Sequence, residues 1–206
     1  MGTDCRRHRE GSRLFAVLGL ALLVAACTKG GGASSEKFEY TDITGVAIGS
    51  DFRLTDHNGH QRSLSDFRGK VIAIFFGFTH CPDVCPTALA ELAQTVKQLG
   101  SQGDEVQILF ITVDPARDTR KVLAQYVPAF DPRFLGLYGD SETTAKVAGA
   151  YKVFYAAQQP NASGNYTVDH TAALFLIDRQ GRPRLYVGGG RTVSGMVHDV
   201  KLLLNE

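Results

Sequence analysis

The chain has 206 residues, of which 44% are hydrophobic, and its 22 basic and 21 acidic side chains give a net charge of +1. That length suits one domain of ordinary size with a proper hydrophobic core. The near balance of charge supplies no long-range field for nucleic acid, so we expect no nucleic-acid partner.

The N-terminus carries the parts of an export signal. Four arginines within the first 13 residues precede an apolar run from Leu14 to Ala26, and small residues lead into Cys27. The run is shorter than the about 20 residues of a membrane-spanning helix. Because Cys27 resembles the lipid-bearing cysteine of bacterial lipoproteins, we expect a signal peptide over 1–26 and lipidation of Cys27. A plain secretory signal or a marginal membrane anchor is the alternative, and each version places the domain outside the cytoplasm.

Export changes the role of the four cysteines. Cys5 leaves with the signal and Cys27 receives lipid, so Cys81 and Cys85 remain, in a compartment where free thiols tend to oxidise. A structural disulfide between them is one interpretation. A bridge that closes so short a loop would restrict the unfolded chain little, so a functional thiol pair is the stronger interpretation.

The predicted elements follow a flexible tether over 27–37 and form one domain over 38–206. Strands over 51–55 and 61–64 flank Asn58-Gly59, which is a strong hairpin signal. The continuous apolar run over 71–78 is typical of a strand buried on both faces. The pattern then predicts, in chain order, a helix over 86–99, a strand over 106–113, helices over 119–127 and 141–150, a hairpin of 172–177 with 184–187, and a helix over 193–203.

This order predicts the α/β fold class. We expect a thioredoxin-like mixed β-sheet flanked by helices, with an N-terminal β-hairpin. The polar segment 155–169 is predicted to be an inserted loop before the strand that follows His170.

The central motif is Cys81-Pro82-Asp83-Val84-Cys85, which lies where a buried strand ends and a helix begins. Amides at a helix start stabilise a thiolate over a thiol. If the segment is partly helical, the four-residue spacing places both sulfurs on one face. That separation suits a reversible disulfide or two sulfurs that share one metal ion, and it is wider than the C-x-x-C of thiol oxidoreductases.

Ligand count favours copper at this motif. Two thiolates select Cu(I), zinc or iron–sulfur clusters, but a cluster and structural zinc each want four protein ligands. Cu(I) needs two or three, so a third ligand is sought, and His170 is the first candidate because its strand begins beside the cysteine turn. His80 is the rival, although its position next to Cys81 makes joint chelation awkward. His57, His60 and His198 are expected at the surface.

A third element, Val113 to Thr119, ends the second buried strand. Asp114 is a candidate to face the cysteines and tune their charge. Arg117 and Asp118 are expected to form a local ion pair, with Asp118 or Thr119 capping the next helix. Asp169 is expected to point away from His170.

These motifs resemble those of the Sco/SenC family of copper chaperones for cytochrome c oxidase. The resemblance covers about residues 49 to 205 and is carried by four segments: 78–86, 113–119, 151–155 and 168–171, the last running into Leu176-Ile177-Asp178. It differs in two respects, since many members have an aromatic residue where His80 stands and are anchored by a transmembrane helix.

The resemblance implies a thioredoxin-like fold that faces the periplasm. It also implies that Cys81, Cys85 and His170 bind copper, as Cu(I) or as Cu(II). It implies assembly of the dinuclear copper centre of oxidase subunit II, or service to other copper proteins, by a monomer lipid-anchored at the inner membrane. No enzymatic turnover is required for this task. A thiol-disulfide oxidoreductase, in which Cys81 and Cys85 form a disulfide, stays open, and a peroxidase-like relative is disfavoured because its P-x-x-x-T/S-x-x-C context is absent.

Overall fold

The computed structural model describes residues 37–206. The predicted signal peptide, the lipidation of Cys27 and all but the last residue of the tether lie outside these residues. Within the described range, no helix combines the length and the apolar character that crossing a bilayer demands.

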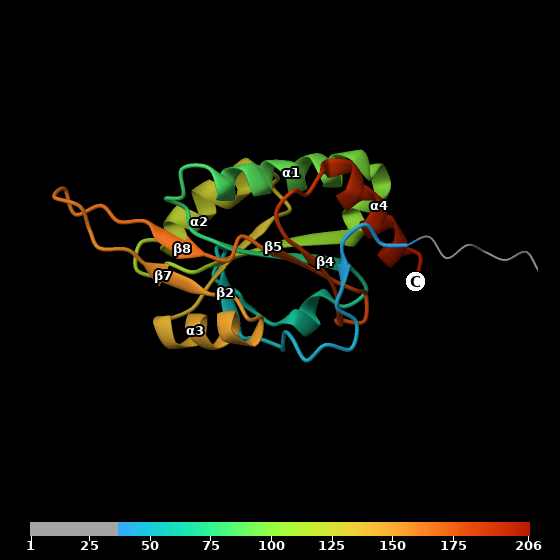
Figure 1. Ribbon diagram of the computed structural model, residues 1–206, viewed down its shortest axis with the longest axis horizontal. Coiled ribbons are helices and arrows are strands. Elements are labelled where there is room, and N and C mark those ends of the chain that lie inside the picture. Colours follow the sequence, from blue (N-terminus) through green and yellow to red (C-terminus); the bar gives the residue numbers. More distant parts are fainter. Residues whose placement is uncertain (1–36) are drawn as a thin grey trace, which may run out of the picture. The chain divides into compact units, whose positions relative to one another are not determined.

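An eight-stranded mixed sheet forms the centre of the domain, in the order β1-β10-β9-β4-β5-β6-β2-β3 (Figure 1). β4 is parallel to β5 and antiparallel to β9, and all of its residues are buried, as the apolar run predicts. The strands are β1 (Thr41–Asp42), β2 (Leu54–Asp56), β3 (Gln61–Arg62), β4 (Val71–Gly77), β5 (Val106–Thr112), β6 (Leu135–Tyr138), β9 (Leu174–Ile177) and β10 (Pro183–Val187).

Helices cover both faces of this sheet. In Figure 1, α1 and α4, which contact each other, lie on one side and α3 lies on the other. The helices are α1 (Val84–Gln98), α2 (Arg120–Tyr126), α3 (Ser141–Ala150) and α4 (Val193–Leu204), with short 3-10 helices η1 (Leu64–Phe67), η2 (Gly100–Glu105) and η3 (Val127–Ala129). The thioredoxin-like mixed sheet flanked by helices is confirmed, as is the N-terminal hairpin of β2 and β3.

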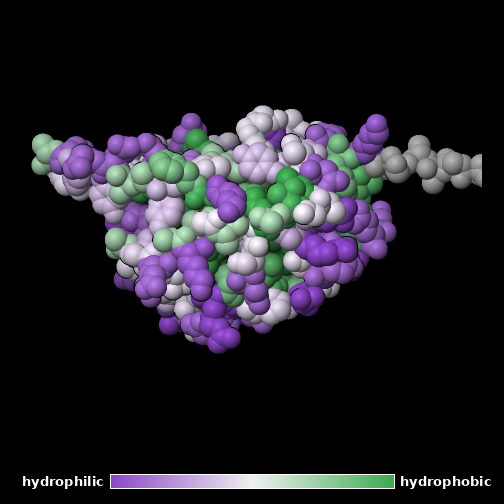
Figure 2. All heavy atoms as spheres, turned by 60° about the horizontal axis from the view of Figure 1, so that its bottom comes forward, coloured by the Kyte–Doolittle hydropathy of each residue, from purple (hydrophilic) through white to green (hydrophobic). Residues whose placement is uncertain are grey.

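The segment predicted as an inserted loop is instead a β-hairpin. β7 (Tyr155–Ala157) pairs with β8 (Val168–His170) as a separate two-stranded sheet, and His170 lies opposite Tyr155. Its projecting end, at the left of Figure 2, is mostly hydrophilic, and residues 157–165 are exposed. Each strand has only three residues, which is too few for an alternation of polar and apolar side chains to be recognised in the sequence. His170 therefore ends β8, and the main-sheet strand β9 begins four residues later.

The sequence analysis also missed the strand β6 and misplaced His57. β6 was not predicted, because four residues that include a glycine show no clear period. Gly136 in β6 is required by packing, since a Cβ there would lie 2.9 Å from a methyl of Val127. His57 was expected at the surface but is only 7% exposed, and its Nδ1 accepts a hydrogen bond from the Gly136 amide at 3.0 Å. The His57 amide also donates to the Gly136 carbonyl at 2.9 Å, so the hairpin turn is bonded to β6 by both backbone and ring.

Candidate metal centre

Three side chains that are far apart in the sequence meet beyond the end of β4. The ligand atoms of Cys81, Cys85 and His170 all lie within 4.8 Å of one another. Within residues 37–206, no fourth Cys, His, Asp or Glu belongs to this group. The cluster is therefore a two-sulfur, one-nitrogen arrangement of the size that a single metal ion spans.

The two cysteines are positioned by the junction between β4 and α1. The Cys81 amide donates to the Phe78 carbonyl at 3.3 Å, and Cys85 lies in the first turn of α1, which begins at Val84, two residues before the predicted start at Pro86. The Cys85 amide, one of the helix-start amides without an intrahelical acceptor, donates to Cys81 Sγ at 3.4 Å. This contact directs a helix-start N–H at the sulfur of Cys81, which is partly exposed.

Cys85 is the buried member of the pair. Burial raises the pKa of the Cys85 thiol far above its ordinary value, and the neighbouring Cys81 adds to the rise. In the metal-free protein Cys85 is therefore a neutral thiol. A bound cation reverses this preference, because a metal ion deprotonates a thiol that coordinates it. Both cysteines are free thiols in this structure.

Gly77 at the end of β4 makes room for the Cys85 sulfur. A Cβ at this position would lie 2.9 Å from Cys85 Sγ and 2.8 Å from the Phe110 ring. Real Cβ atoms do not approach other atoms so closely. The absent side chain therefore determines how deeply Cys85 can be buried.

Asp118 holds the loop that carries Cys81, and it does not pair with Arg117 as predicted. Its fully buried carboxylate accepts hydrogen bonds from the Thr79 amide at 3.0 Å, the Thr79 hydroxyl at 2.6 Å and the Thr112 hydroxyl at 2.6 Å. It thereby ties the cysteine loop to the end of β5. The predicted helix cap is Thr119, whose hydroxyl accepts from the Val122 amide.

His170 presents its Nε2 atom to Cys85 Sγ at 3.4 Å. Its Nδ1 lies 3.2 Å from the Thr171 carbonyl, which can only accept, so Nδ1 carries the hydrogen and the Nε2 lone pair faces the sulfur. Burial lowers the pKa of His170, against smaller opposing contributions from Thr171 and Asp169. The ring is therefore neutral at pH 7, which is the form that binds metals.

Aromatic rings surround the imidazole. The rings of Phe75 and Phe78 meet the His170 ring edge to face, with centroids 6.2 and 5.8 Å away.

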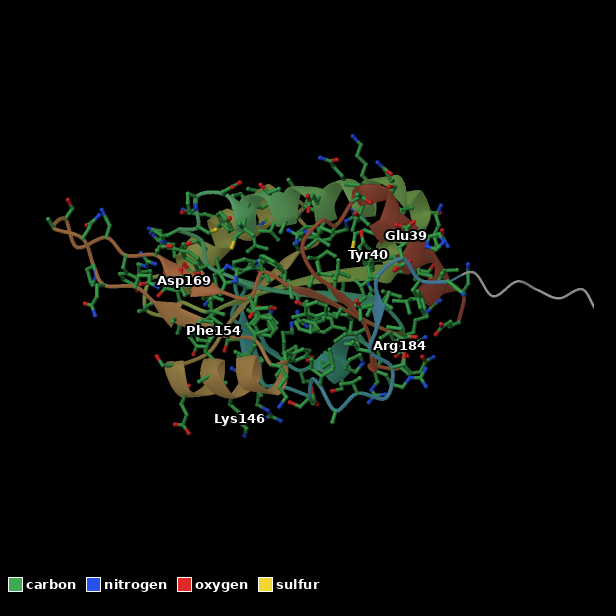
Figure 3. All side chains as sticks on the ribbon, viewed as in Figure 1. Glu39, Tyr40, Lys146, Phe154, Asp169 and Arg184 are labelled. Carbon is green, nitrogen blue, oxygen red and sulfur yellow. The ribbon has the colours of Figure 1, made fainter. Side chains whose placement is uncertain are left out.

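Asp169, labelled on the hairpin in Figure 3, is exposed and accepts from the Gln158 amide group across the two strands. It points away from the sulfurs, as predicted.

The rival ligands do not belong to the cluster. His80 is exposed, and its Nδ1 lies 3.1 Å from the Thr79 hydroxyl and 3.8 Å from Asp118. Asp114 does not serve the sulfurs directly, because its two carboxylate oxygens accept from Arg117 and Tyr166. Arg117 is thus paired with Asp114 instead of Asp118. Sequence reasoning missed Tyr166 altogether, since a tyrosine in a polar segment carries no local signal of this role.

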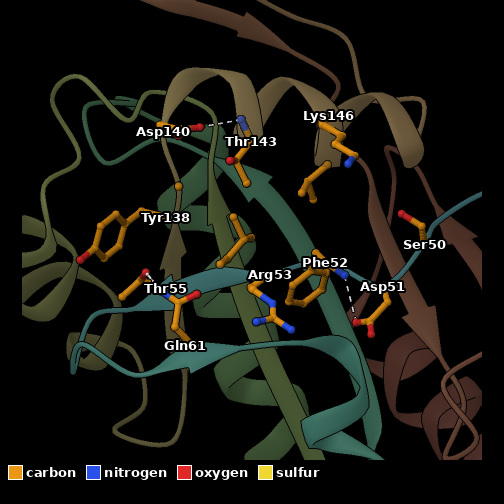
Figure 4. A pocket seen from close by; sticks show the side chains of 13 residues that line it. Ser50, Asp51, Phe52, Arg53, Thr55, Gln61, Tyr138, Asp140, Thr143 and Lys146 are labelled. Carbon is orange, nitrogen blue, oxygen red and sulfur yellow. Dashed lines mark hydrogen bonds between the residues drawn. The ribbon is translucent and has the colours of Figure 1, made fainter.

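The arrangement suits a soft ion with few ligands. Two thiolates and one neutral imidazole match Cu(I), whereas structural zinc takes four protein ligands. A pocket of about 470 Å³ lies elsewhere, between β2 and α3, and is lined by Arg53, Asp140 and Lys146 among others (Figure 4). It includes none of the three cluster residues.

The sequence of this chain matches a known protein family along almost the whole described domain. The family model described as SCO1/SenC matches residues 41–205. The chain belongs to the SCO1/SenC family. This confirms the resemblance drawn from the four sequence segments.

Other members of the SCO1/SenC family are similar over most of the chain. The mitochondrial protein SCO2 homolog of Bos taurus is 40% identical over 186 residues, which are 89% of this chain and 70% of that protein. The structure of Bradyrhizobium japonicum ScoI with copper bound is 43% identical, with a TM-score of 0.71, and covers 77% of this chain and 100% of that one. Yeast Sco1 with copper bound is 32% identical, with a TM-score of 0.71, over 78% of this chain and 90% of that one.

Proposed function

We propose that this chain is a copper-binding metallochaperone that assists assembly of the dinuclear copper centre of cytochrome c oxidase subunit II. The observation that carries the proposal is the convergence of Cys81, Cys85 and His170 within 4.8 Å. Copper-bound structures of two family members support copper as the cargo. Cu(I) is held by the two sulfurs and the His170 Nε2 atom, and the same set is open to Cu(II).

Copper transfer requires no change of oxidation state. Thiolates of the recipient replace those of Cys81 and Cys85 one at a time, so each broken copper–sulfur bond is matched by a new one. The partly exposed Cys81 is the ligand that a recipient reaches first, because Cys85 is fully buried. The recipient must itself present reduced thiols.

The location of the protein remains part of the proposal. A signal peptide over 1–26 would direct export, and lipid on Cys27 with a tether over 27–37 would then hold a monomeric domain at the periplasmic side of the inner membrane. All of these features fall at or before the first described residue. Mass measurement of the mature N-terminus of the protein purified from membranes tests the lipid, and an unmodified Cys27 contradicts it.

Metal analysis of the purified protein under reducing conditions tests the proposed function. We expect about one Cu(I) per chain in the wild type, with loss of tight binding in Cys81→Ala and Cys85→Ala and weaker binding in His170→Ala. His80→Ala is the matched control and should bind like the wild type. A wild type that fails to bind Cu(I), or a His80→Ala defect as large as that of His170→Ala, overturns the assignment.

A thiol-disulfide oxidoreductase is the second candidate. Cys81, the more exposed thiol, attacks a partner's disulfide as its thiolate, and Cys85 then displaces the partner, so that the Cys81–Cys85 disulfide forms as the partner is reduced. The raised pKa of Cys85 slows this second step. Full cellular activity of His170→Ala favours this candidate, because thiol exchange needs no imidazole ligand.

A further inference from the structure

The element that carries His170 is not joined to the main sheet. β7 and β8 pair only with each other, whereas the cysteines follow a central strand of the eight-stranded sheet. Backbone pairing therefore does not determine how His170 lies relative to Cys85. The short link over 171–173 keeps His170 near β9, and side chains between the hairpin and the body of the domain must do the rest.

One group of side chains makes this connection, and we name Asp114, Arg117 and Tyr166 the clamp. Arg117 Nε donates to one Asp114 carboxylate oxygen at 2.5 Å, and the Tyr166 hydroxyl donates to the other at 2.9 Å. Arg117 Nη1 also donates to the Tyr166 carbonyl at 2.7 Å. The clamp thus joins the loop after β5 to Tyr166, which lies two residues before the start of β8.

Ring contacts continue the connection to the imidazole. The Arg117 guanidinium carbon lies 3.5 Å from the centre of the Tyr166 ring and 5.9 Å from that of Phe78. A planar guanidinium stacks well on such rings. The Phe78 ring in turn meets the His170 ring at 5.8 Å, nearly perpendicular at 88°. Arg117 therefore lies between the hairpin and the aromatic wall of the metal centre.

Burial indicates that the clamp specifies geometry more than it adds stability. Asp114 is 5% exposed and the Arg117 side chain 20% exposed, and Arg117 Nη2 is buried with no acceptor among the described residues. A buried ion pair loses much of its attraction to desolvation, and its best-attested use is to select one arrangement. Desolvation and the Asp114 carboxylate raise the pKa of Tyr166, so its hydroxyl stays a donor.

We propose that Arg117 is a positioning residue that holds His170 at the metal through the clamp. It contacts neither copper nor a sulfur, and it acts by fixing the hairpin against Phe78. Opening the clamp reduces the ligands from three to two while both cysteines stay in place, which eases release of Cu(I) by ligand exchange. The copper consequence rests on the proposed function, whereas the placement of His170 does not.

Cu(I) competition with a chromophoric chelator tests the copper consequence in a double-mutant cycle. Loss of a residue that orients a metal ligand typically weakens metal binding about 10- to 100-fold, and we expect this for Arg117→Gln. In a His170→Ala background, Arg117→Gln should cause no further loss. Arg133→Gln is the matched control, since Arg133 is a salt-bridged arginine on the exposed surface beside Asp104 and Asp131. Equal losses in both backgrounds, or no loss in either, overturn the proposal.

A measurement on the metal-free protein separates this proposal from the proposed function. The nuclear Overhauser contact between the His170 and Phe78 rings should be present in the wild type and Arg133→Gln, and absent in Arg117→Gln. Its persistence in Arg117→Gln overturns the proposal even if copper binds as expected. If the wild type binds no Cu(I), the proposed function fails and this contact alone decides the role of Arg117. Should Arg117→Gln not fold, Tyr166→Phe removes one donor of the clamp and should weaken the same contact.

Discussion

Cys85 and His170 lie 3.4 Å apart, but the structure holds them by different means. The cysteine region, residues 77–85, begins at the last residue of β4 in the middle of the main sheet and is tied to β5 by Asp118. The histidine region, residues 155–170, is a hairpin outside that sheet, and the clamp joins it to the domain. Backbone pairing and core packing position the sulfurs, while side chains position the imidazole.

The comparison teaches that stability and metal affinity should respond to different substitutions. Changes in the cysteine region disturb buried groups of the main domain, so they should lower the free energy of unfolding. Changes in the histidine region disturb few buried groups of the main domain, so they should act on local order or on copper.

The largest effect on stability is expected from Asp118→Ala. It leaves the partly buried Thr79 amide and the buried Thr112 hydroxyl without their acceptor, which should lower the free energy of unfolding by about 3 kcal/mol. The neighbouring Thr119→Ala removes only an exposed helix cap and should cost about 1 kcal/mol. Urea denaturation measures both, and equal losses would show that Asp118 does not anchor the cysteine region.

Gly77→Ala should act within the same region at a smaller cost. The added methyl would overlap Cys85 Sγ and the Phe110 ring, and overpacking of this kind costs about 1–3 kcal/mol. The displaced sulfur should also weaken Cu(I) binding. Gly149→Ala in α3 is the control, because a Cβ there meets nothing within 4 Å and should stabilise the helix by about 0.5–1 kcal/mol. Unchanged stability and copper binding in Gly77→Ala would contradict the close packing.

Acidification should affect the histidine region first. The pKa of His170 is lowered in the folded protein by burial, so the unfolded chain binds the proton more readily. The stability gained from docking the neutral ring is complete above the ordinary value of 6.5 and is lost as pH falls through the lowered pKa. Without metal, amides of Val168–His170 should lose protection from hydrogen exchange at pH 5 while those of β4 keep theirs.

Two variants identify the group that causes this pH dependence. His170→Gln should abolish the loss of protection in β8, since glutamine does not titrate. His57→Gln should leave it unchanged, although burial lowers the pKa of His57 as well. Loss of protection in β4 together with β8 would mean that acid opens the whole domain and would remove the contrast between the two regions.

The smallest effect is expected at the tip of the hairpin. Asn161 accepts hydrogen bonds from the amides of Ser163 and Asn165, all within an exposed turn. Asn161→Ala should therefore change the free energy of unfolding by less than about 0.5 kcal/mol and leave Cu(I) affinity unaltered. A marked loss of affinity in calorimetric titration would show that the whole hairpin, and not only its clamped base, positions His170.

The sequence by itself determined the architecture and the thiol pair. The apolar runs of β4 and β5, the helical spacing after Cys85 and the Asn58-Gly59 turn are local patterns, so they could be interpreted without knowledge of distant contacts. The expected export signal and lipidation, which would remove Cys5 and Cys27 from consideration, pointed to Cys81 and Cys85 by the same kind of reasoning. His170 required a topological inference and a family resemblance in addition.

Only the tertiary structure decided which groups support that site. Asp118 binds Thr79 across 39 positions, Arg117 binds Tyr166 across 49, and His57 binds Gly136 across 79. No local period encodes such pairs, because they form only when the sheet brings loop ends together. For this reason the expected Arg117–Asp118 pair and the exposed His57 were wrong. The sequence identified the two cysteines and offered two histidines, His170 and His80, as the third ligand. Folding decided between them, because the hairpin outside the main sheet brings His170 to the sulfurs.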